Sequence, residues 1–238
     1  MRKTMENSEL FKVLLGANRL SITSAQFFNS MASNKKPIAK SKLRGTSCKE
    51  NIMRDQYAGD ISDFFKFAFL RAVASDAEIN LGVGWFYVDA NDGRPDGKHT
   101  EYLEQTHLRD LDPVLFDQLS NLPERSVKAL QALPIWNDTT VFHTDPIPSE
   151  NNPVTRQAWS WKMAQELSGC NVVFIDPDNS VTWNGSITSR HARLDEVKVL
   201  ASNNRPLIFI KFPSRDKKHP QQIADLHQGI SKNTHSTH

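Results

Sequence analysis

Residues 171–179 read Asn-Val-Val-Phe-Ile-Asp-Pro-Asp-Asn, and this stretch decides the fold. Its apolar run is short, uninterrupted and rich in β-branched residues. Such a run is typical of a strand that is buried on both faces, as in parallel sheets. Pro177 and the polar residues around it favour a turn. We therefore expect a central strand that ends at Asp176.

The flanking segments complete a helix and strand alternation. Asn152 as N-cap and Pro153 at the first helical position begin a helix that Gly169 closes. We expect its inward face to consist of Val154, Ala158, Trp161, Ala164 and Leu167. Residues 190–202 are predicted to form a second helix, and residues 206–212 another buried strand. We expect the inward face of the second helix to consist of Leu194, Val197, Leu200 and Ala201. This αβαβ order favours a parallel sheet with right-handed crossovers.

An amphipathic helix is predicted upstream of this unit. Asp60 is a suitable N-cap, and the helix is expected to end near Ser75. Its apolar residues repeat every three or four positions: Ile61, Phe64, Phe65, Ala68, Phe69 and Ala72. Lys66 and Arg71 lie away from this main apolar stripe.

The middle of the chain is predicted to be helical, with one strand on each side. Residues 84–89 form an apolar run that stops at the turn-forming residues 91–97, which indicates a buried strand and a long polar loop. Residues 101–133 are expected to be helical in pieces that two prolines interrupt. Residues 140–143 are a candidate strand.

The positive charge gathers at the N-terminus, where residues 1–50 carry ten Lys and Arg against three acidic residues. We expect residues 1–53 to be a disordered basic arm or leader, either simply solvated or in contact with nucleic acid. Residues 54–230 are predicted to form one α/β domain, and residues 231–238 a disordered tail. If residues 207–212 are the last strand, their open apolar edge predicts a homodimer through that strand.

Several classes of protein are excluded by the sequence. Cys48 and Cys170 lie far apart without a Cys/His cluster, which excludes a disulfide framework and the usual zinc modules. The sequence contains neither a run of about 18 apolar residues nor a signal-peptide pattern, so we expect no membrane contact and a cytoplasmic protein. Walker and HExxH motifs do not occur either.

Polar residues follow the two strands that are predicted to be buried. Asp176, Asp178 and Asn179 come after one strand, and Asp89 ends the other. Loops converge at the carboxyl ends of parallel strands, where ligands bind, so we expect these groups to share one solvated rim. They could orient an amine, accept a proton or hold a divalent cation. The competing interpretation is that Asp178 and Asn179 cap the next turn.

The sequence also contains a pattern that is found in metal-dependent nucleases, Pro177-Asp178 followed by Glu196-Val-Lys198. In that chemistry the Glu and Lys belong on a strand beside the Asp. Here they fall in the helix predicted for residues 190–202, and we expect both side chains to face outward. The pattern is therefore a weak indication of a nuclease.

The segment Tyr57-Ala-Gly59-Asp60-Ile-Ser-Asp63-Phe-Phe-Lys66 resembles the opening motif of the large-subunit ribosomal RNA adenine-N6 methyltransferases. In that family a strand ending in Asp follows, here at Asp89, and a later strand ends in an Asp-Pro-Pro-Tyr motif, here Asp176-Pro-Asp-Asn179. The chain looks closer still to a bacterial family of unassigned function that has an Asp-Pro-Asp-Asn motif.

The resemblance implies a three-layer, Rossmann-like fold of the class I methyltransferase type that binds S-adenosylmethionine and methylates an amino group of a nucleic acid base. The implied catalytic residues are Asp176, Pro177, Asp178 and Asn179. The implied cofactor-binding residues are Tyr57, Gly59, Asp60, Lys66, Asp89, Asn91, Gly93 and Arg94.

A second class of function stays open beside this one. A Rossmann-like nucleotide- or Mg²⁺-binding hydrolase or nuclease would use Asp176 and Asp178 as metal ligands. A catalytically inactive binding module would keep the fold without the reaction.

Overall fold

The structure is a computed structural model. It describes residues 12–15, 20–23, 55–76, 78–88, 99–148, 152–177, 181–182, 188, 191–201, 205–210, 217–218, 220–225 and 228.

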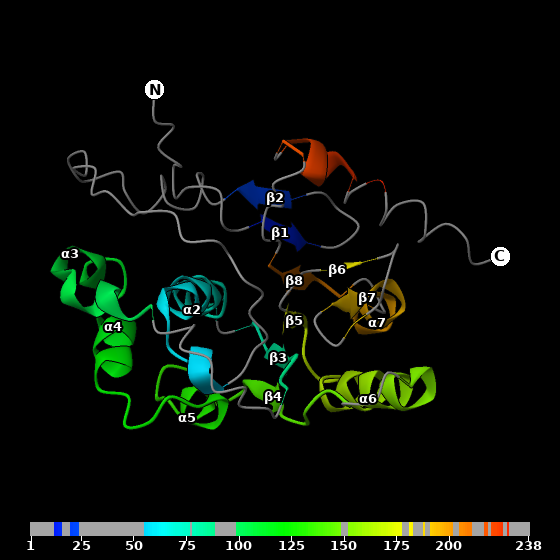
Figure 1. The fold of residues 1–238 in the computed structure, drawn as a ribbon, viewed down its shortest axis with the longest axis horizontal. Helices are drawn as coiled ribbons and strands as arrows, with labels where there is room; N and C mark the ends of the chain where they lie inside the picture. The colour runs from blue at the N-terminus through cyan, green and yellow to red at the C-terminus, as the bar shows by residue number, and fades with distance from the viewer. Residues whose placement is uncertain are drawn as a thin grey trace.

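A six-stranded sheet in the order β2-β1-β8-β5-β3-β4 forms the centre of the molecule (Figure 1). Its four strands from β8 to β4 are parallel to one another. Their bounds are Leu81–Trp85 for β3, Val141–His143 for β4, Val172–Asp176 for β5 and Leu207–Phe209 for β8. The expectation of an α/β fold with a mostly parallel sheet is confirmed, and the strand order is compatible with a Rossmann-like fold.

Helices cover both faces of this sheet (Figure 1). One face packs against α2 (Ile61–Val73), α4 (Pro113–Ser120) and α5 (Val127–Gln131), and the short α3 (Thr106–Arg109) contacts α4. The other face packs against α6 (Pro153–Glu166) and α7 (Leu194–Leu200). The remaining short elements are η2 (Asp55–Tyr57), η3 (Glu101–Glu104), the paired strands β6 (Val181–Thr182) and β7 (Ala192–Arg193), and a helical segment at 220–225.

The chain reverses its winding direction at β3. From β3 it moves outward to β4 by way of α3, α4 and α5, and it then returns across β3 to β5 and β8 by way of α6 and α7. Right-handed crossovers in opposite directions place their helices on opposite faces, as observed. The switch point therefore lies between β3 and β5, and in such sheets this is where ligands bind.

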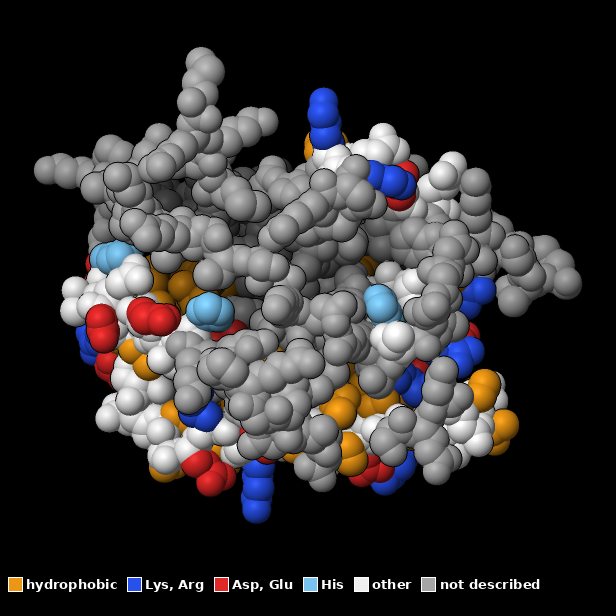
Figure 2. All heavy atoms as spheres, viewed as in Figure 1, with side chains coloured by type: hydrophobic (Ala, Val, Ile, Leu, Met, Phe, Trp, Pro, Cys, Tyr) orange, Lys and Arg blue, Asp and Glu red, His pale blue; other side chains and the backbone are white. Residues whose placement is uncertain are grey.

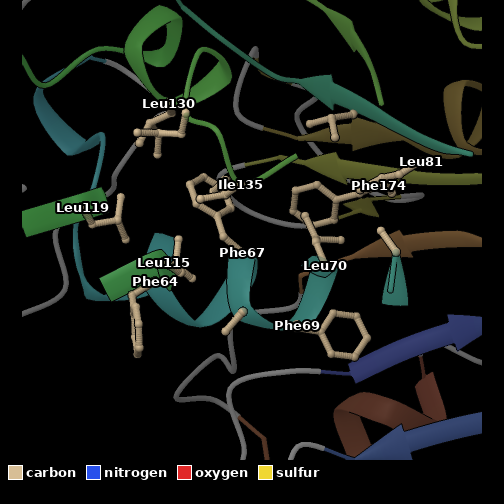
Figure 3. Close-up of a cluster of buried hydrophobic side chains, with 14 of the residues drawn as sticks. Phe64, Phe67, Phe69, Leu70, Leu81, Leu115, Leu119, Leu130, Ile135 and Phe174 are labelled. Carbon is tan, nitrogen blue, oxygen red and sulfur yellow. The ribbon is translucent and has the colours of Figure 1, made fainter. Parts of the chain in front are cut away.

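The core between α2 and the sheet is rich in aromatic rings (Figure 3). Phe64, Phe67 and Leu70 on α2 are fully buried, as are Leu81 on β3 and Phe174 on β5. Burial of each such side chain contributes about 1.5–3 kcal/mol, so α2 is held firmly against the ends of these strands. The predicted N-cap Asp60 is confirmed, and α2 ends two residues before the expected position.

The predicted inward face of α6 is wrong in part. The side chains of Val154 and Trp161 are 72% and 52% exposed, and apolar side chains reach the surface in the region of α6 (Figure 2). Leu167 is buried as predicted, whereas Trp159 and Met163 are buried in place of Val154 and Trp161. Both sets of residues have helical spacing, and contact with the sheet selects the second set. At Gly84 on β3, a Cβ atom would lie only 2.6 Å from Met163 Sδ, which shows how closely α6 approaches the sheet.

Glu196 on α7 is buried, so the prediction that it faces outward is wrong. Its carboxylate accepts two hydrogen bonds from Arg156 on α6, at 2.5 and 3.1 Å, and one from the backbone N–H of Arg193. The Arg156 guanidinium also lies over the Trp159 ring. A buried carboxylate persists only when it is paired in this way, so this ion pair joins α6 to α7.

Two short strands fall inside the segment that was expected to be disordered. β1 (Lys12–Leu15) pairs antiparallel with β2 (Leu20–Thr23) and with the outer edge of β8. The expectation of disorder does not hold for these eight residues. The other residues between 1 and 54 lie outside the described residues. β1 pairs with β8 at Leu14 and Leu207, and the homodimer through this strand stays a prediction.

β3 and the start of α4 also differ from the elements that the sequence predicted. β3 begins and ends earlier than the predicted 84–89, because the parallel ladder with β5 stops at the pair Trp85 and Asp176. Pro113 begins α4 at its first position and does not interrupt a helix. Among the residues that the structure describes, none of the helices has the length and apolar character needed to span a bilayer.

Candidate functional site

The candidate site lies where β3 and β5 end, next to the switch point of the sheet. Asp176, the last residue of β5, is in register with Trp85, the last residue of β3. Residues paired in register on parallel strands point to the same face, which here is the face that α2 covers. The N-terminal half of α2 thus lies directly over the end of β5.

A tight turn at Gly59 leads the chain into α2. Gly59 has φ 75°, a left-handed conformation that glycine adopts without steric cost. Asp60 then caps the helix, because its Oδ1 accepts hydrogen bonds from the backbone N–H groups of Ser62 at 2.8 Å and Asp63 at 3.1 Å. The Asp63 carboxylate folds back and accepts a hydrogen bond of 2.8 Å from the Gly59 N–H. The turn and the first turn of α2 therefore form one rigid unit.

Side chains from distant parts of the chain hold this turn in place. The Tyr102 hydroxyl donates to the Gly59 carbonyl at 3.1 Å, and the Arg125 guanidinium donates to the Ala58 carbonyl at 2.7 Å. Asp55 accepts hydrogen bonds from the Val127 N–H and the Tyr87 hydroxyl. These contacts fix α2 relative to α5, η3 and the segment after β3.

Lys66 joins α2 to β5 through a buried ion pair. Its Nζ lies 2.7 Å from Asp176 Oδ2 and 3.2 Å from Asp63 Oδ1. The exposed fractions of Lys66, Asp63 and Asp176 are only 7%, 2% and 4%. Two predictions from the sequence, on the exposure of Lys66 and of Asp176, are wrong. Lys66 is buried although it lies away from the apolar stripe of α2, and Asp176 is not a solvated rim carboxylate, because α2 and Lys66 cover it.

Burial and mutual attraction shift the ionisation of these groups in opposite directions. Burial raises the pKa of Asp63 to about 7, although the Lys66 ammonium opposes this change, and the carboxylates of Asp60 and Asp176 add to it. Burial also raises the pKa of Asp60. Burial alone would lower the pKa of Lys66, but the carboxylates of Asp176 and Asp63 outweigh it, and the net direction is upward.

The arrangement favours some reactions over others. Lys66 remains a cation at neutral pH because its pKa is raised, so it cannot act as a general base. This ammonium group lies 2.7 Å from the carboxylate of Asp176, and a carboxylate is a strong hydrogen-bond acceptor. A divalent cation on Asp176 would have to displace or tolerate this ammonium group. Lys66 engages Oδ2 of Asp176, so a donor from a ligand would have to reach Oδ1.

Half of the site residues that were predicted from the sequence lie in the part of the chain that the structure describes. Asp176 and Lys66 are in direct contact, Gly59 and Asp60 form the turn beside them, and Pro177 is buried directly after β5. Tyr57 ends η2 and is buried just before the turn. The other predicted residues lie outside the described residues: Asp89, Asn91, Gly93, Arg94, Asp178 and Asn179.

Asp63 and Tyr102 complete the site and were missing from the predicted set. A signal for Asp63 existed, because Asp63 and Lys66 are three residues apart and therefore adjacent on one helical face. Tyr102 has no such signal, since its contact with Gly59 spans 43 positions of the chain.

The fold places Glu196, one residue of the nuclease pattern, away from Asp176. Glu196 is engaged by Arg156 on the face of the sheet that α6 and α7 cover, opposite to α2 and Lys66. Asp178 lies outside the described residues. Within the described residues, no group of three His, Cys, Asp or Glu side chains is placed to hold a metal ion.

Comparison with known proteins gave no relative: no family model, no curated protein and no solved structure matches this chain. Any functional assignment must therefore come from the chemistry of the site itself.

Proposed function

We propose that the protein is an S-adenosylmethionine-dependent methyltransferase that acts on an amino group of a nucleic acid base. The observation that carries this proposal is the Asp176 carboxylate at the switch point, with Lys66 beside it and Pro177 after it. The nucleic acid as substrate is supported by the resemblance of the motif at 57–66 and by the positive charge of residues 1–50.

Asp176 has the chemistry needed to orient an amine. Lys66 contacts Oδ2, and among the described residues it is the one donor that the structure gives to this carboxylate. Oδ1 would accept an N–H of the substrate amine, and the Pro177 carbonyl would accept the other. Two such bonds hold the amine nitrogen with its lone pair directed at an incoming methyl group, which is the contribution that orientation makes to catalysis.

We expect the adenosyl cofactor to bind beside Asp176, at the switch point between β3 and β5. Two buried polar atoms without a partner among the described residues lie at strand ends, Trp85 Nε1 on β3 and His143 Nε2 on β4. Asp145 follows β4, and an acidic residue after the neighbouring strand binds ribose hydroxyls in dinucleotide-binding sheets of this kind. His143 lies on the opposite face, against Trp159 of α6, and Asp145 pairs with Lys162. Trp85 is therefore the residue of these three that would contact the nucleoside part of S-adenosylmethionine, which when bound supplies an electrophilic methyl group.

The Mg²⁺-dependent hydrolase is less well supported by the same geometry. Mg²⁺ is bound by carboxylate oxygens and water, and a second cation close to the ligand set opposes its binding. The Lys66 ammonium occupies that position at 2.7 Å from Asp176.

Ligand-induced stabilisation distinguishes the two functions. S-adenosylmethionine at a hundred times its Kd should stabilise the fold by about 2.7 kcal/mol and raise the melting temperature by several degrees. Mg²⁺ with ATP should produce no such shift. The Asp176→Asn variant should keep the shift with S-adenosylmethionine, because Asp176 contacts the substrate amine. A shift with Mg²⁺ and ATP but none with S-adenosylmethionine would overturn the proposal in favour of the hydrolase.

A further inference from the structure

Trp85, the last residue of β3, carries a buried hydrogen-bond donor that is not satisfied. Its side chain is fully buried, and its indole Nε1 has no hydrogen-bond partner among the described residues. A buried N–H group without an acceptor is costly, so an unsatisfied group of this kind in a folded protein requires an explanation. A ligand that supplies the missing acceptor is such an explanation.

The position of Trp85 connects this donor with the candidate site. Trp85 and Asp176 are paired in register, so both side chains point to the face of the sheet that α2 covers. The pair lies at the carboxyl ends of β3 and β5, beside the switch point where ligands bind in such sheets. The other unsatisfied buried atoms of the described residues lie elsewhere: Gln131 Nε2 at the end of α5, Thr140 Oγ1 before β4 and His143 Nε2 on the opposite face.

The chemistry of the indole N–H restricts the ligand atom that it can bind. The group donates and does not accept, so its partner must be an acceptor. The surroundings are aromatic and apolar, since the Trp85 ring meets Phe67 edge-on with the ring centroids 6.0 Å apart. A ribose hydroxyl placed there would bring a donor of its own that also needs a partner. A purine ring nitrogen only accepts, and the flat base suits aromatic neighbours.

We propose that Trp85 selects the nucleoside of the cofactor by donating a hydrogen bond from Nε1 to a ring nitrogen of the adenine. This inference rests on the proposed function, which supplies the cofactor. It assigns recognition of the base to β3 and orientation of the substrate amine to Asp176 on β5. A nucleoside with a C–H group at the recognised position would leave the Trp85 donor unpaired and should be rejected.

Binding of S-adenosylhomocysteine, which contains the same nucleoside, tests the hydrogen bond without any assay of activity. Three deaza analogues each replace one ring nitrogen of the adenine, N1, N3 or N7, by C–H. Isothermal titration calorimetry with the full-length wild type should show that one analogue binds about tenfold more weakly or worse, because it leaves the donor unpaired. The other two analogues should bind as the parent compound does. Equal affinities for all four compounds overturn the inference.

The Trp85→Phe variant shows whether this discrimination comes from Trp85. Phenylalanine keeps an aromatic ring and removes the N–H, so the variant should bind the discriminated analogue as well as it binds S-adenosylhomocysteine. Trp136→Phe is the matched control, because Trp136 packs against the same Phe67 ring and its Nε1 already donates to the Leu130 carbonyl at 2.9 Å. The control should keep the wild-type affinities for all four compounds. If Trp85→Phe discriminates as the wild type does, another residue reads the base and the inference is wrong.

The indole N–H signals in NMR spectra of the wild type test the same bond without relying on the folding of a variant. The chain has five tryptophans. One indole proton should move downfield when S-adenosylhomocysteine binds, because a donor gains an acceptor, and it should not do so with the discriminated analogue. That signal should be absent from the spectrum of Trp85→Phe. The inference is overturned if no indole proton moves downfield at saturation.

The outcomes separate the inference from the proposed function. If the wild type binds neither S-adenosylmethionine nor S-adenosylhomocysteine, the proposed function fails and the role of Trp85 fails with it. If the wild type binds both compounds and removal of the indole N–H leaves the affinities and the discrimination unchanged, the role of Trp85 is wrong while the proposed function stands.

Discussion

At the scale of single residues, Lys66 balances the charge of the buried site. Removal of its ammonium group in Lys66→Met leaves Asp63 and Asp176 without their common partner. Breaking a buried ion pair from one side costs about 3–5 kcal/mol, and we expect a loss of this size in urea denaturation at pH 7.5. The loss should be smaller at pH 5, where protons neutralise the unpaired carboxylates. Lys162→Met, which removes an exposed ion pair with Asp145, should have little effect. Equal losses in both variants would contradict this role of Lys66.

Asp63 also makes the stability of the fold depend on pH. Its pKa is about 7 in the folded protein against 3.8 in a model peptide, so the folded state binds the proton more tightly between these values. The stability that this proton contributes is present in full below about pH 4 and is lost as the pH rises through 7. The free energy of unfolding of the wild type relative to Asp63→Asn should therefore be higher at pH 5 than at pH 8. A difference that stays constant or grows with pH would show that Asp63 is ionised throughout.

Sequence reasoning located part of the site because local signals mark it. Gly59, Asp60 and Lys66 form a turn, a cap and a cation in one short motif, and Asp176 ends an apolar run. Their contacts could not be predicted in the same way. The ion pair between Lys66 and Asp176 spans 110 positions, and its burial depends on how α2 crosses the sheet.

At the scale of elements, α6 shows why a helix can be predicted while its orientation is not. The N-cap Asn152 and Pro153 fix its start, but two apolar sets share its surface. We expect Trp159→Ala to destabilise the fold by about 3–5 kcal/mol, since Trp159 is buried, whereas Trp161→Ala should cost much less because Trp161 is half exposed. Chemical denaturation of both variants measures this difference. A larger loss for Trp161→Ala would restore the face predicted from the sequence.

At the scale of the whole molecule, the alternation of helices and apolar runs was sufficient to predict a mostly parallel sheet with helices on both faces. The strand order was not predictable, because it depends on which neighbour each strand selects after the chain has crossed the sheet. β1 illustrates the limit, since its Leu14 pairs with Leu207 of β8 from almost 200 positions away.

The proposed function requires that Asp176 receives the substrate amine, and an assay of methyl transfer measures this directly. Full-length protein is incubated with methyl-labelled S-adenosylmethionine and with RNA and DNA pools, and label on base amino groups is quantified for the wild type, Asp176→Asn and Glu196→Gln. We predict transfer by the wild type and by Glu196→Gln, and a loss of about a hundredfold or more in Asp176→Asn, which still folds and still binds S-adenosylmethionine. Transfer by Asp176→Asn at the wild-type rate, or none by the wild type, would contradict the account.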